Sequence, residues 1–233
     1  MQDLDFSVVR FNTRILDPIR FENVELAAPN GSKIIDDLSF SVQVGETFGL
    51  LGPSRSGKST IANMIIGQTF HSEGSLNIFN QPTSGNIKNI YPEIGICPQA
   101  SSLWPYVTVR EHLEIFGRIK GLYGTELTEE VNYIIESVEM GEIADKYASD
   151  LSLGDRRLLS VGIASISCPL IQVYDEPSIG MDPMAKRKFW KYLLTVKKRR
   201  LCSIIITTQL IKEAENLCNR IGNDISLGAH VTL

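Results

Sequence analysis

A glycine-rich loop between a hydrophobic strand and a helix constrains this chain more than any other feature. The loop runs from Gly52 to Ser59 with the sequence GPSRSGKS, which fits the pattern GxxxxGK[ST]. A strand is expected over 46–51 before it, and a helix over 58–67 after it. In that arrangement, backbone N–H groups and a helix N-terminus point at a bound anion. The segment therefore predicts a phosphate-binding loop, and the alternative is an ordinary glycine-containing turn.

The loop residues have expected roles toward ATP and Mg²⁺. Lys58 is expected to reach the β- and γ-phosphates, and the Ser59 hydroxyl to ligate Mg²⁺. The other expected nucleotide contacts lie in the loop and the first helical turn: Gly52, Pro53, Ser54, Arg55, Ser56, Gly57 and Thr60.

A second hydrophobic run ends in two acidic residues. The segment 170–174 predicts a buried strand, and Asp175 and Glu176 follow it. Asp175 is expected to hold Mg²⁺ through water, and Glu176 to polarise an attacking water as general base. On its own, the pattern also fits a strand that ends in an acidic turn.

Strands and helices alternate along most of the chain, which is typical of an α/β fold with a largely parallel sheet. Strands are predicted over 21–26, 34–42, 46–51, 94–98, 171–175 and 203–207. Helices are predicted over 58–67, 109–120, 131–138 and 155–167, with another beginning at Asp182-Pro183. Residues from about 101 to 168 thus predict a helical insertion within one sheet core.

Composition and charge exclude several classes of function. The 233 residues carry a formal net charge of −4, which argues against a nucleic-acid partner. No apolar run approaches the roughly 20 residues of a membrane span, and the amino terminus does not resemble a secretory signal. The four cysteines form no CxxC pair, so reduced cysteines in the core are expected rather than zinc or disulfides. We expect a soluble, cytosolic chain.

Together with the segment Asp150–Arg157, these motifs resemble the nucleotide-binding domain of ATP-binding cassette (ABC) transporters. The resemblance covers residues from about 19 to 228 and implies a P-loop NTPase (RecA-like) parallel-sheet core, a small antiparallel β part and a helical subdomain. Several stretches are similar to the A subfamily, whose members mostly move lipids: 36–54, 94–99, 108–121, 175–183 and 213–221. Residues 1–18 are interpreted as a linker, and 19–233 as the nucleotide-binding domain.

The resemblance implies a head-to-tail dimer of two such domains around two ATP molecules. Ser152 and Gly154 would contact the γ-phosphate bound by the other domain, although Ser152 also fits a simple helix cap with Asp155. Gln99 matches a glutamine that contacts Mg²⁺ and links the site to the membrane domains; the alternative is a polar residue that ends a strand. The implied partners are a second cassette and transmembrane domains absent from this chain, at the cytosolic face of a membrane.

Several residues depart from the family pattern. Leu153 replaces a glycine of the signature segment, and Gln209 stands where the family places its switch histidine. Gln209 can donate a hydrogen bond to a γ-phosphate but cannot become a cation. Arg55 also replaces a glycine, which predicts a positive φ there. The segment 25–28 lacks the aromatic that relatives stack on adenine, and Phe21 is expected in the core.

These observations lead to one function and leave alternatives. We expect an ATP-hydrolysing cassette that powers an A-subfamily-like transporter, with lipid as cargo. The alternatives are a regulatory domain that binds ATP and barely hydrolyses it, and a soluble ABC ATPase without a membrane partner. Trp104 and Tyr106 are expected in a partly exposed apolar groove that docks the membrane domains; the alternative is burial in the helical insertion.

Overall fold

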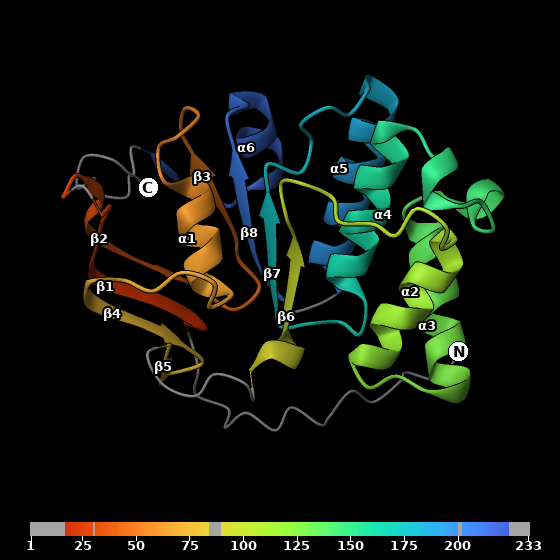
Figure 1. Cartoon of the computed structure of the whole chain (residues 1–233), viewed down its shortest axis with the longest axis horizontal. Helices are drawn as coiled ribbons and strands as arrows, with labels where there is room; N and C mark the ends of the chain where they lie inside the picture. Colours follow the sequence, from red (N-terminus) through yellow and green to blue (C-terminus); the bar gives the residue numbers. More distant parts are fainter. Residues whose placement is uncertain (1–16, 30, 84–89, 200–201, 224–233) are drawn as a thin grey trace.

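The computed structural model describes residues 17–29, 31–83, 90–199 and 202–223, and it contains two β-sheets and a group of helices (Figure 1). The predicted linker lies outside the described residues except for its last two. Among the described residues, no helix has both the length and the apolarity needed to span a membrane.

The smaller sheet is antiparallel. Its strands, in order, are β2 (Lys33–Val42), β1 (Ile19–Ala27), β4 (Glu73–Ile78) and β5 (Gln81–Pro82). Phe21 of β1 is buried and stacks on Phe40 at a ring-centroid distance of 4.5 Å. Its predicted place in the core is confirmed.

The larger sheet is parallel and lies at the centre of the molecule. Its strands, in order, are β6 (Ile94–Cys97), β7 (Ile171–Asp175), β8 (Ser203–Thr208), β3 (Thr47–Leu51) and β9 (Arg220–Asn223). All six residues of β8 are buried, as the β-branched run IIITT after Ser203 predicts for a central parallel strand. β3, the first of these strands in the sequence, pairs with β8 and β9, the last two.

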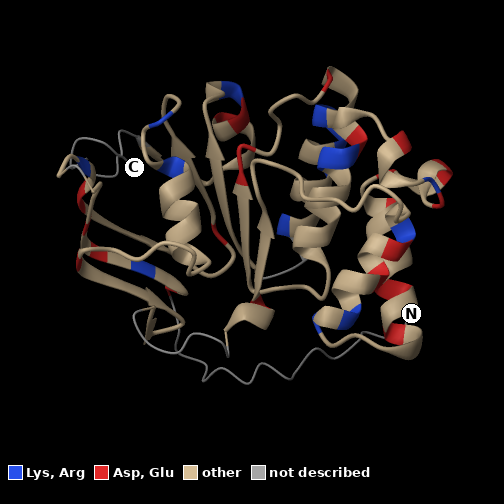
Figure 2. Ribbon diagram, in the orientation of Figure 1, with Lys and Arg blue, Asp and Glu red and all other residues tan. Residues whose placement is uncertain are grey.

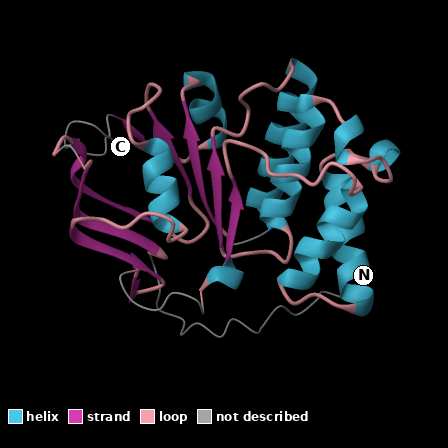
Figure 3. Ribbon diagram, viewed as in Figure 1, coloured by secondary structure: helices cyan, strands magenta, loops and turns pink. Residues whose placement is uncertain are grey.

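The two faces of the parallel sheet belong to different hydrophobic cores. Side chains alternate along a strand, so Ile204 and Ile206 pack among the helices while Ile205 packs toward the antiparallel sheet. Figure 3 shows the order of layers: the antiparallel strands, then helix α1 (Lys58–Ile65), then the parallel strands, then the group of helices that includes α2 to α5. The parallel strands carry few charges along their length, whereas acidic residues mark the carboxyl end of β7 (Figure 2).

Capping interactions fix where several helices begin. The helices are α1 (Lys58–Ile65), α2 (Val109–Ile119), α3 (Gly124–Ser137), α4 (Leu153–Ser165), α5 (Pro183–Arg199) and α6 (Ile211–Leu217). Thr108 and Glu111 form a reciprocal capping box at the start of α2, as predicted. At the start of α5, Asp182 accepts hydrogen bonds from the N–H groups of Met184 and Ala185.

The predicted fold class is confirmed, with corrections to individual elements. The helix predicted over 131–138 begins at Gly124, because Leu127 extends the buried stripe of Val131, Ile134 and Ile135 by one more turn. The prediction did not include β4, β5, β9 or α6. Cys97 and Cys202 are buried, as expected for cysteines in the core, whereas Cys168 and Cys218 are partly exposed.

Candidate functional site

The loop between β3 and α1 turns through two residues with positive φ. Arg55 has φ 68° and Gly57 has φ 91°, so the positive φ predicted at Arg55 is confirmed. Gly52 leaves no room for a side chain, since a Cβ there would lie 2.8 Å from the Ser56 hydroxyl. That hydroxyl is buried and has no hydrogen-bond partner among the described residues. The loop therefore encloses a polar atom that a bound anion could satisfy.

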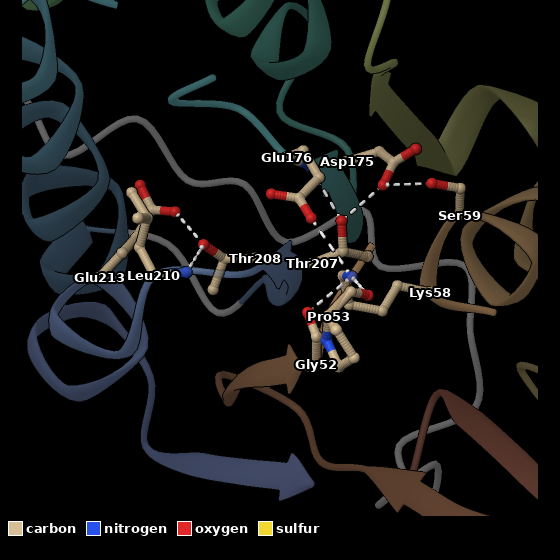
Figure 4. A network of polar contacts seen from close by, with 10 residues as sticks. All are labelled: Gly52, Pro53, Lys58, Ser59, Asp175, Glu176, Thr207, Thr208, Leu210 and Glu213. Carbon is tan, nitrogen blue, oxygen red and sulfur yellow. Dashed lines mark hydrogen bonds and ion pairs between the residues drawn. The ribbon is translucent and has the colours of Figure 1, made fainter. Parts of the chain in front are cut away.

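Lys58 points back beneath the loop. Its Nζ donates to the carbonyl oxygens of Gly52 at 2.8 Å and Pro53 at 2.7 Å, and it lies 3.3 Å from Glu176 Oε1. Both members of this ion pair are almost completely buried. The ammonium has three N–H groups for these three acceptors. Lys58 is thus held at the position from which a cation can reach a phosphate in the loop (Figure 4).

Asp175 connects the first turn of α1 to the ends of β7 and β8. Its Oδ1 accepts hydrogen bonds from the Ser59 hydroxyl at 3.1 Å and from the Thr207 hydroxyl. Mg²⁺ at a phosphate site usually takes one or two protein oxygens together with phosphate oxygens and water. The oxygens of Ser59 and Asp175 therefore fit Mg²⁺ beside a phosphate chain.

Glu176 has an unusual backbone conformation. Its φ is 46°, a region that costs a non-glycine residue about 1–2 kcal/mol. The Glu176 N–H donates to both the hydroxyl and the carbonyl oxygen of Thr207, at 2.9 and 3.1 Å. These bonds help to hold the backbone that carries the candidate base.

The turn after β8 carries Gln209, whose side chain is exposed toward the pocket. Thr208 and Leu210 on either side are fixed: the Thr208 hydroxyl donates to Glu213 Oε2 at 2.6 Å and accepts the Leu210 N–H at 3.0 Å. Glu213, on α6, is buried and also accepts from the Trp190 indole. The backbone around Gln209 is therefore held while its side chain stays available.

Most of the predicted site residues line one pocket. Its lining is Ile34, Ser54, Arg55, Gly57, Lys58, Ser59, Thr60, Gln99, Glu176 and Gln209. Of the remaining predictions, Gly52 and Pro53 contribute carbonyl oxygens beneath the loop, Ser56 is buried inside it, and Asp175 bonds Ser59. Residues far apart in the sequence are thus brought to one edge of the parallel sheet.

Ser152 and Gly154 do not line this pocket; they lie at the start of α4. The Ser152 hydroxyl accepts the Asp155 N–H at 3.1 Å and lies 2.7 Å from its carboxylate, so the helix cap is present. Gly154 packs against α5, where a Cβ would meet that of Ala185 at 2.8 Å. Leu153 between them is 59% exposed, which leaves this helix end accessible to another molecule.

Two titratable groups close to the site have shifted pKa values. Burial raises the pKa of the Cys97 thiol to about 11, so Cys97 stays protonated at neutral pH and is a poor nucleophile. Hydrogen bonds from the backbone N–H groups of Ala185 and Met184 lower the pKa of Asp182. Asp182 therefore stays ionised at the start of α5.

Three residues of the site were not predicted from the sequence. Thr207 contacts both acidic residues, Ile34 places an apolar side chain at the pocket beside the loop, and Arg157 binds the backbone behind Gln99 and Glu176. Thr207 could have been found from its place at the end of a buried strand. The roles of Ile34 and Arg157 depend on tertiary contacts that no local pattern reveals.

Comparisons with known proteins show which proteins the chain is similar to. Residues 35–179 match the family model described as ABC transporter. The chain is 37% identical to ABC transporter A family member 5 of Arabidopsis thaliana, covering 93% of this chain and 22% of the relative. It is 36% identical to Nod factor export ATP-binding protein I of Burkholderia thailandensis, covering 93% of this chain and 72% of that protein. It is also 36% identical to the human cholesterol transporter ABCA5, covering 81% of this chain and 12% of the relative.

Solved structures show the same fold. A dimeric bacterial ABC transporter cassette superposes with a TM-score of 0.80 at 23% identity, covering 88% of this chain and 93% of that one. A dimeric cassette in a post-hydrolysis state, bound to ADP and Pi, gives a TM-score of 0.81 at 22% identity, covering 92% and 97%. The chain spans about a fifth of the length of the plant relatives.

Proposed function

Because this chain belongs to the ABC transporter family, we propose that it binds Mg-ATP beside the phosphate loop and hydrolyses it to power a transporter. Within that family it is an ATP-binding cassette with homologues in the A subfamily. The observation that carries this proposal is the convergence of Lys58, Ser59, Asp175 and Glu176 at one edge of the parallel sheet. A positive charge, two metal-binding oxygens and a candidate base are the groups that phosphoryl transfer to water requires.

In the proposed reaction, the loop N–H groups and the start of α1 hold the phosphates. A γ-phosphate competes with Glu176 for Lys58, which releases the Glu176 carboxylate to accept a proton from the attacking water. Mg²⁺, when bound beside Ser59 and Asp175, neutralises charge on the phosphate oxygens. Gln99 and Gln209 line the same pocket; the Gln99 amide oxygen would be available to Mg²⁺, and the Gln209 amide can donate to the γ-phosphate.

Ile34 supplies an apolar surface where the expected aromatic is missing. It is on β2, lines the pocket and is 36% exposed. We assign it to the adenine base. An aliphatic side chain offers less contact area than an aromatic ring and no stacking, so binding is expected to depend more on the phosphates.

Two partner surfaces follow from exposed residues. The start of α4, with Ser152, Leu153 and Gly154, is proposed to meet the nucleotide of a second cassette in a head-to-tail dimer. Trp104 is 46% exposed and Tyr106 82% exposed, which excludes their burial within the helices. We propose that these two rings dock transmembrane domains at the cytosolic face of a membrane, with lipid as the cargo.

The second candidate function is regulatory binding of ATP with little turnover. It is favoured by Gln209, which cannot become the cation that a histidine provides, and by the missing aromatic. Glu176 favours hydrolysis. Single-turnover hydrolysis with the cognate cassette present distinguishes the two functions: a regulatory domain retains bound ATP unchanged.

Thermal unfolding of wild type and Lys58→Ala tests the nucleotide site. Mg-ATP at about 100 times Kd should stabilise the wild type by about 2.7 kcal/mol. Lys58→Ala should lose most of that stabilisation, because one cation contacts two phosphates. Lys191→Ala, which removes an exposed lysine that bonds Glu139, is the matched control and should keep it. Equal stabilisation of wild type and Lys58→Ala would contradict the assignment.

A further inference from the structure

Arg157 is a buried cation on the second turn of α4. Its side chain is 3% exposed, and its guanidinium donates to acceptors from two loops that are distant in sequence. Nη1 donates to the carbonyl oxygens of Pro98 at 2.6 Å and Gln99 at 2.8 Å. Nη2 donates to that of Glu176 at 3.0 Å and Nε to that of Pro177 at 3.1 Å.

Longer contacts complete this set. Nη2 lies 3.4 Å from the Asp175 carbonyl oxygen, and Nη1 lies 3.5 Å from the Ser101 hydroxyl. Every one of these acceptors is neutral. A buried charge is tolerated when all its donors are hydrogen-bonded, and a guanidinium has five N–H groups in a fixed planar arrangement. A lysine ammonium, with three donors on a single atom, cannot span both loops in this way.

The bonds from Arg157 act on the backbone that orients the candidate base. Glu176 has φ 46°, and its N–H is held by Thr207 on β8. Its carbonyl oxygen accepts from Arg157 and also from the Ile179 N–H at 3.2 Å. Both sides of the Glu176 backbone are thus fixed, one by β8 and the other by α4.

The same guanidinium holds the backbone that carries Gln99. Ser152 and Gly154 begin the helix, and Arg157 lies only about five residues later, roughly 7.5 Å along the axis. A single helix of 13 residues moves as one body over that distance. Contact at the start of α4 is therefore mechanically connected to Gln99 and Glu176.

We propose that Arg157 is a positioning residue that makes the start of α4, the Gln99 loop and Glu176 respond as one unit. The inference rests on the proposed function, in which a triphosphate held by a second cassette contacts Ser152 and Gly154. Binding at that helix end then sets the orientation of the base in the chain's own pocket. Arg157 acts through the backbone and does not itself touch nucleotide.

Hydrogen exchange of the nucleotide-free chain tests the positioning role independently of ATP. The variant is Arg157→Lys, and the matched control is Arg156→Lys, which changes the neighbouring arginine that bonds only Ser149 in this structure's described residues. In Arg157→Lys, peptides over 94–103 and 173–182 should exchange about tenfold faster, because charged hydrogen bonds that oppose local opening are lost. A peptide over 19–27 should not change.

The coupling is tested with Mg²⁺ and the non-hydrolysable analogue AMPPNP. In wild type, protection should appear together at 50–60, 94–103, 150–157 and 173–182. In Arg157→Lys, protection at 50–60 and 150–157 and the AMPPNP dissociation constant should be unchanged, whereas 94–103 and 173–182 should lose their added protection. Single-turnover hydrolysis should fall about tenfold, the loss expected when the general base is misoriented. If Arg157 only stabilised the fold, Arg157→Lys would lower the melting temperature, and all of these peptides would still respond to AMPPNP together.

Other outcomes overturn the inference. Exchange that is unchanged at 94–103 and 173–182, or that rises equally at 19–27, would show that Arg157 does not position these loops. If Arg157→Lys does not fold, Arg157→Gln replaces it. The wild-type response to AMPPNP also tests the coupling by itself: protection at 50–60 without protection at 150–157 and 173–182 would refute it. No protection at 50–60 in wild type would instead contradict the proposed function. The positioning role of Arg157 would then be tested by the exchange of the nucleotide-free chain alone.

Discussion

At the scale of single residues, Arg55 is the clearest departure within the phosphate loop. Its left-handed backbone, φ 68°, costs about 1–2 kcal/mol for a residue with a side chain. Its side chain is exposed and lines the pocket. A cation at this position offers a planar set of donors to phosphate oxygens, which a glycine cannot provide.

Replacing Arg55 tests whether the guanidinium or the backbone strain has the larger effect on the affinity for Mg-ATP. We expect Arg55→Gly to weaken Mg-ATP binding about fivefold, since an exposed charge interaction contributes up to about 1 kcal/mol. The loss should be larger at low ionic strength, where screening is weakest. Titration calorimetry at two salt concentrations measures it, with Arg55→Lys as the variant that keeps the charge. Tighter binding by Arg55→Gly would show that relief of backbone strain dominates.

At the scale of elements, the start of α2 depends on a neutral histidine. Buried His112 places Nδ1 2.8 Å from the Thr108 carbonyl oxygen, and its Nε2 accepts the Trp104 N–H at 3.0 Å. The Trp104 ring stacks on His112 and on Phe116, with centroid distances of 5.5 and 5.6 Å. A protonated imidazole has no acceptor, so it would lose the bond to Trp104.

Stability should therefore depend on pH through His112. Burial lowers the pKa of His112 in the folded chain, despite the nearby Glu111 carboxylate. The unfolded histidine titrates near 6.5, so below that pH the unfolded state binds more protons than the folded state. The free energy of unfolding should fall as pH drops from 6.5 toward the lower folded pKa.

Urea unfolding between pH 7.5 and 5.5 measures this effect. His112→Gln can still donate and accept at this position but does not titrate, so its free energy of unfolding should fall less than that of the wild type. The difference between the two proteins cancels contributions from the other histidines. Parallel pH profiles would mean that His112 is not the group responsible.

The sequence predicts some elements better than others for physical reasons. β8 and the capped α2 carry their signals locally, as an apolar β-branched run and a Thr108–Glu111 box. β4 was not predicted because its sequence EGSLNI is mostly polar. Its Gly74 lies against the Asn23 carbonyl, a contact that exists only after β4 has paired with β1. α6 has seven residues and no side-chain cap. Likewise, local motifs predicted Lys58 and Asp175, whereas Arg157 acquires its role only in the fold.

At the scale of the whole molecule, Arg55 at the pocket and Leu153 at the start of α4 are both exposed. Neither surface is completed within the described part of the chain. A second cassette placed head to tail would bring an exposed helix N-terminus to each pocket, where it can bind phosphate oxygens. The proposed dimer thus accounts for both surfaces at once.

Glu176→Gln tests the dimer. The amide cannot accept the proton from water, so Mg-ATP should remain bound and hold two chains together. Analytical ultracentrifugation should show a dimer with Mg-ATP and a monomer without nucleotide. Adding Leu153→Asp should restore the monomer, because it places a negative charge at the helix start that faces the partner's phosphates. A monomer that binds Mg-ATP without associating would refute a head-to-tail dimer made of two copies of this chain.

The strand order determines when the phosphate loop can become functional during synthesis. β3 leaves the ribosome early, yet its two partners, β8 and β9, begin at Ser203 and Arg220. The antiparallel sheet pairs residues closer in sequence and can form while the rest is still being made. In a nascent chain halted before Ser203, the complete GPSRSGKS segment follows a strand whose two edges have no partner yet, and such a species is exposed to aggregation. Nucleotide can therefore act as a folding ligand only after synthesis has passed β8.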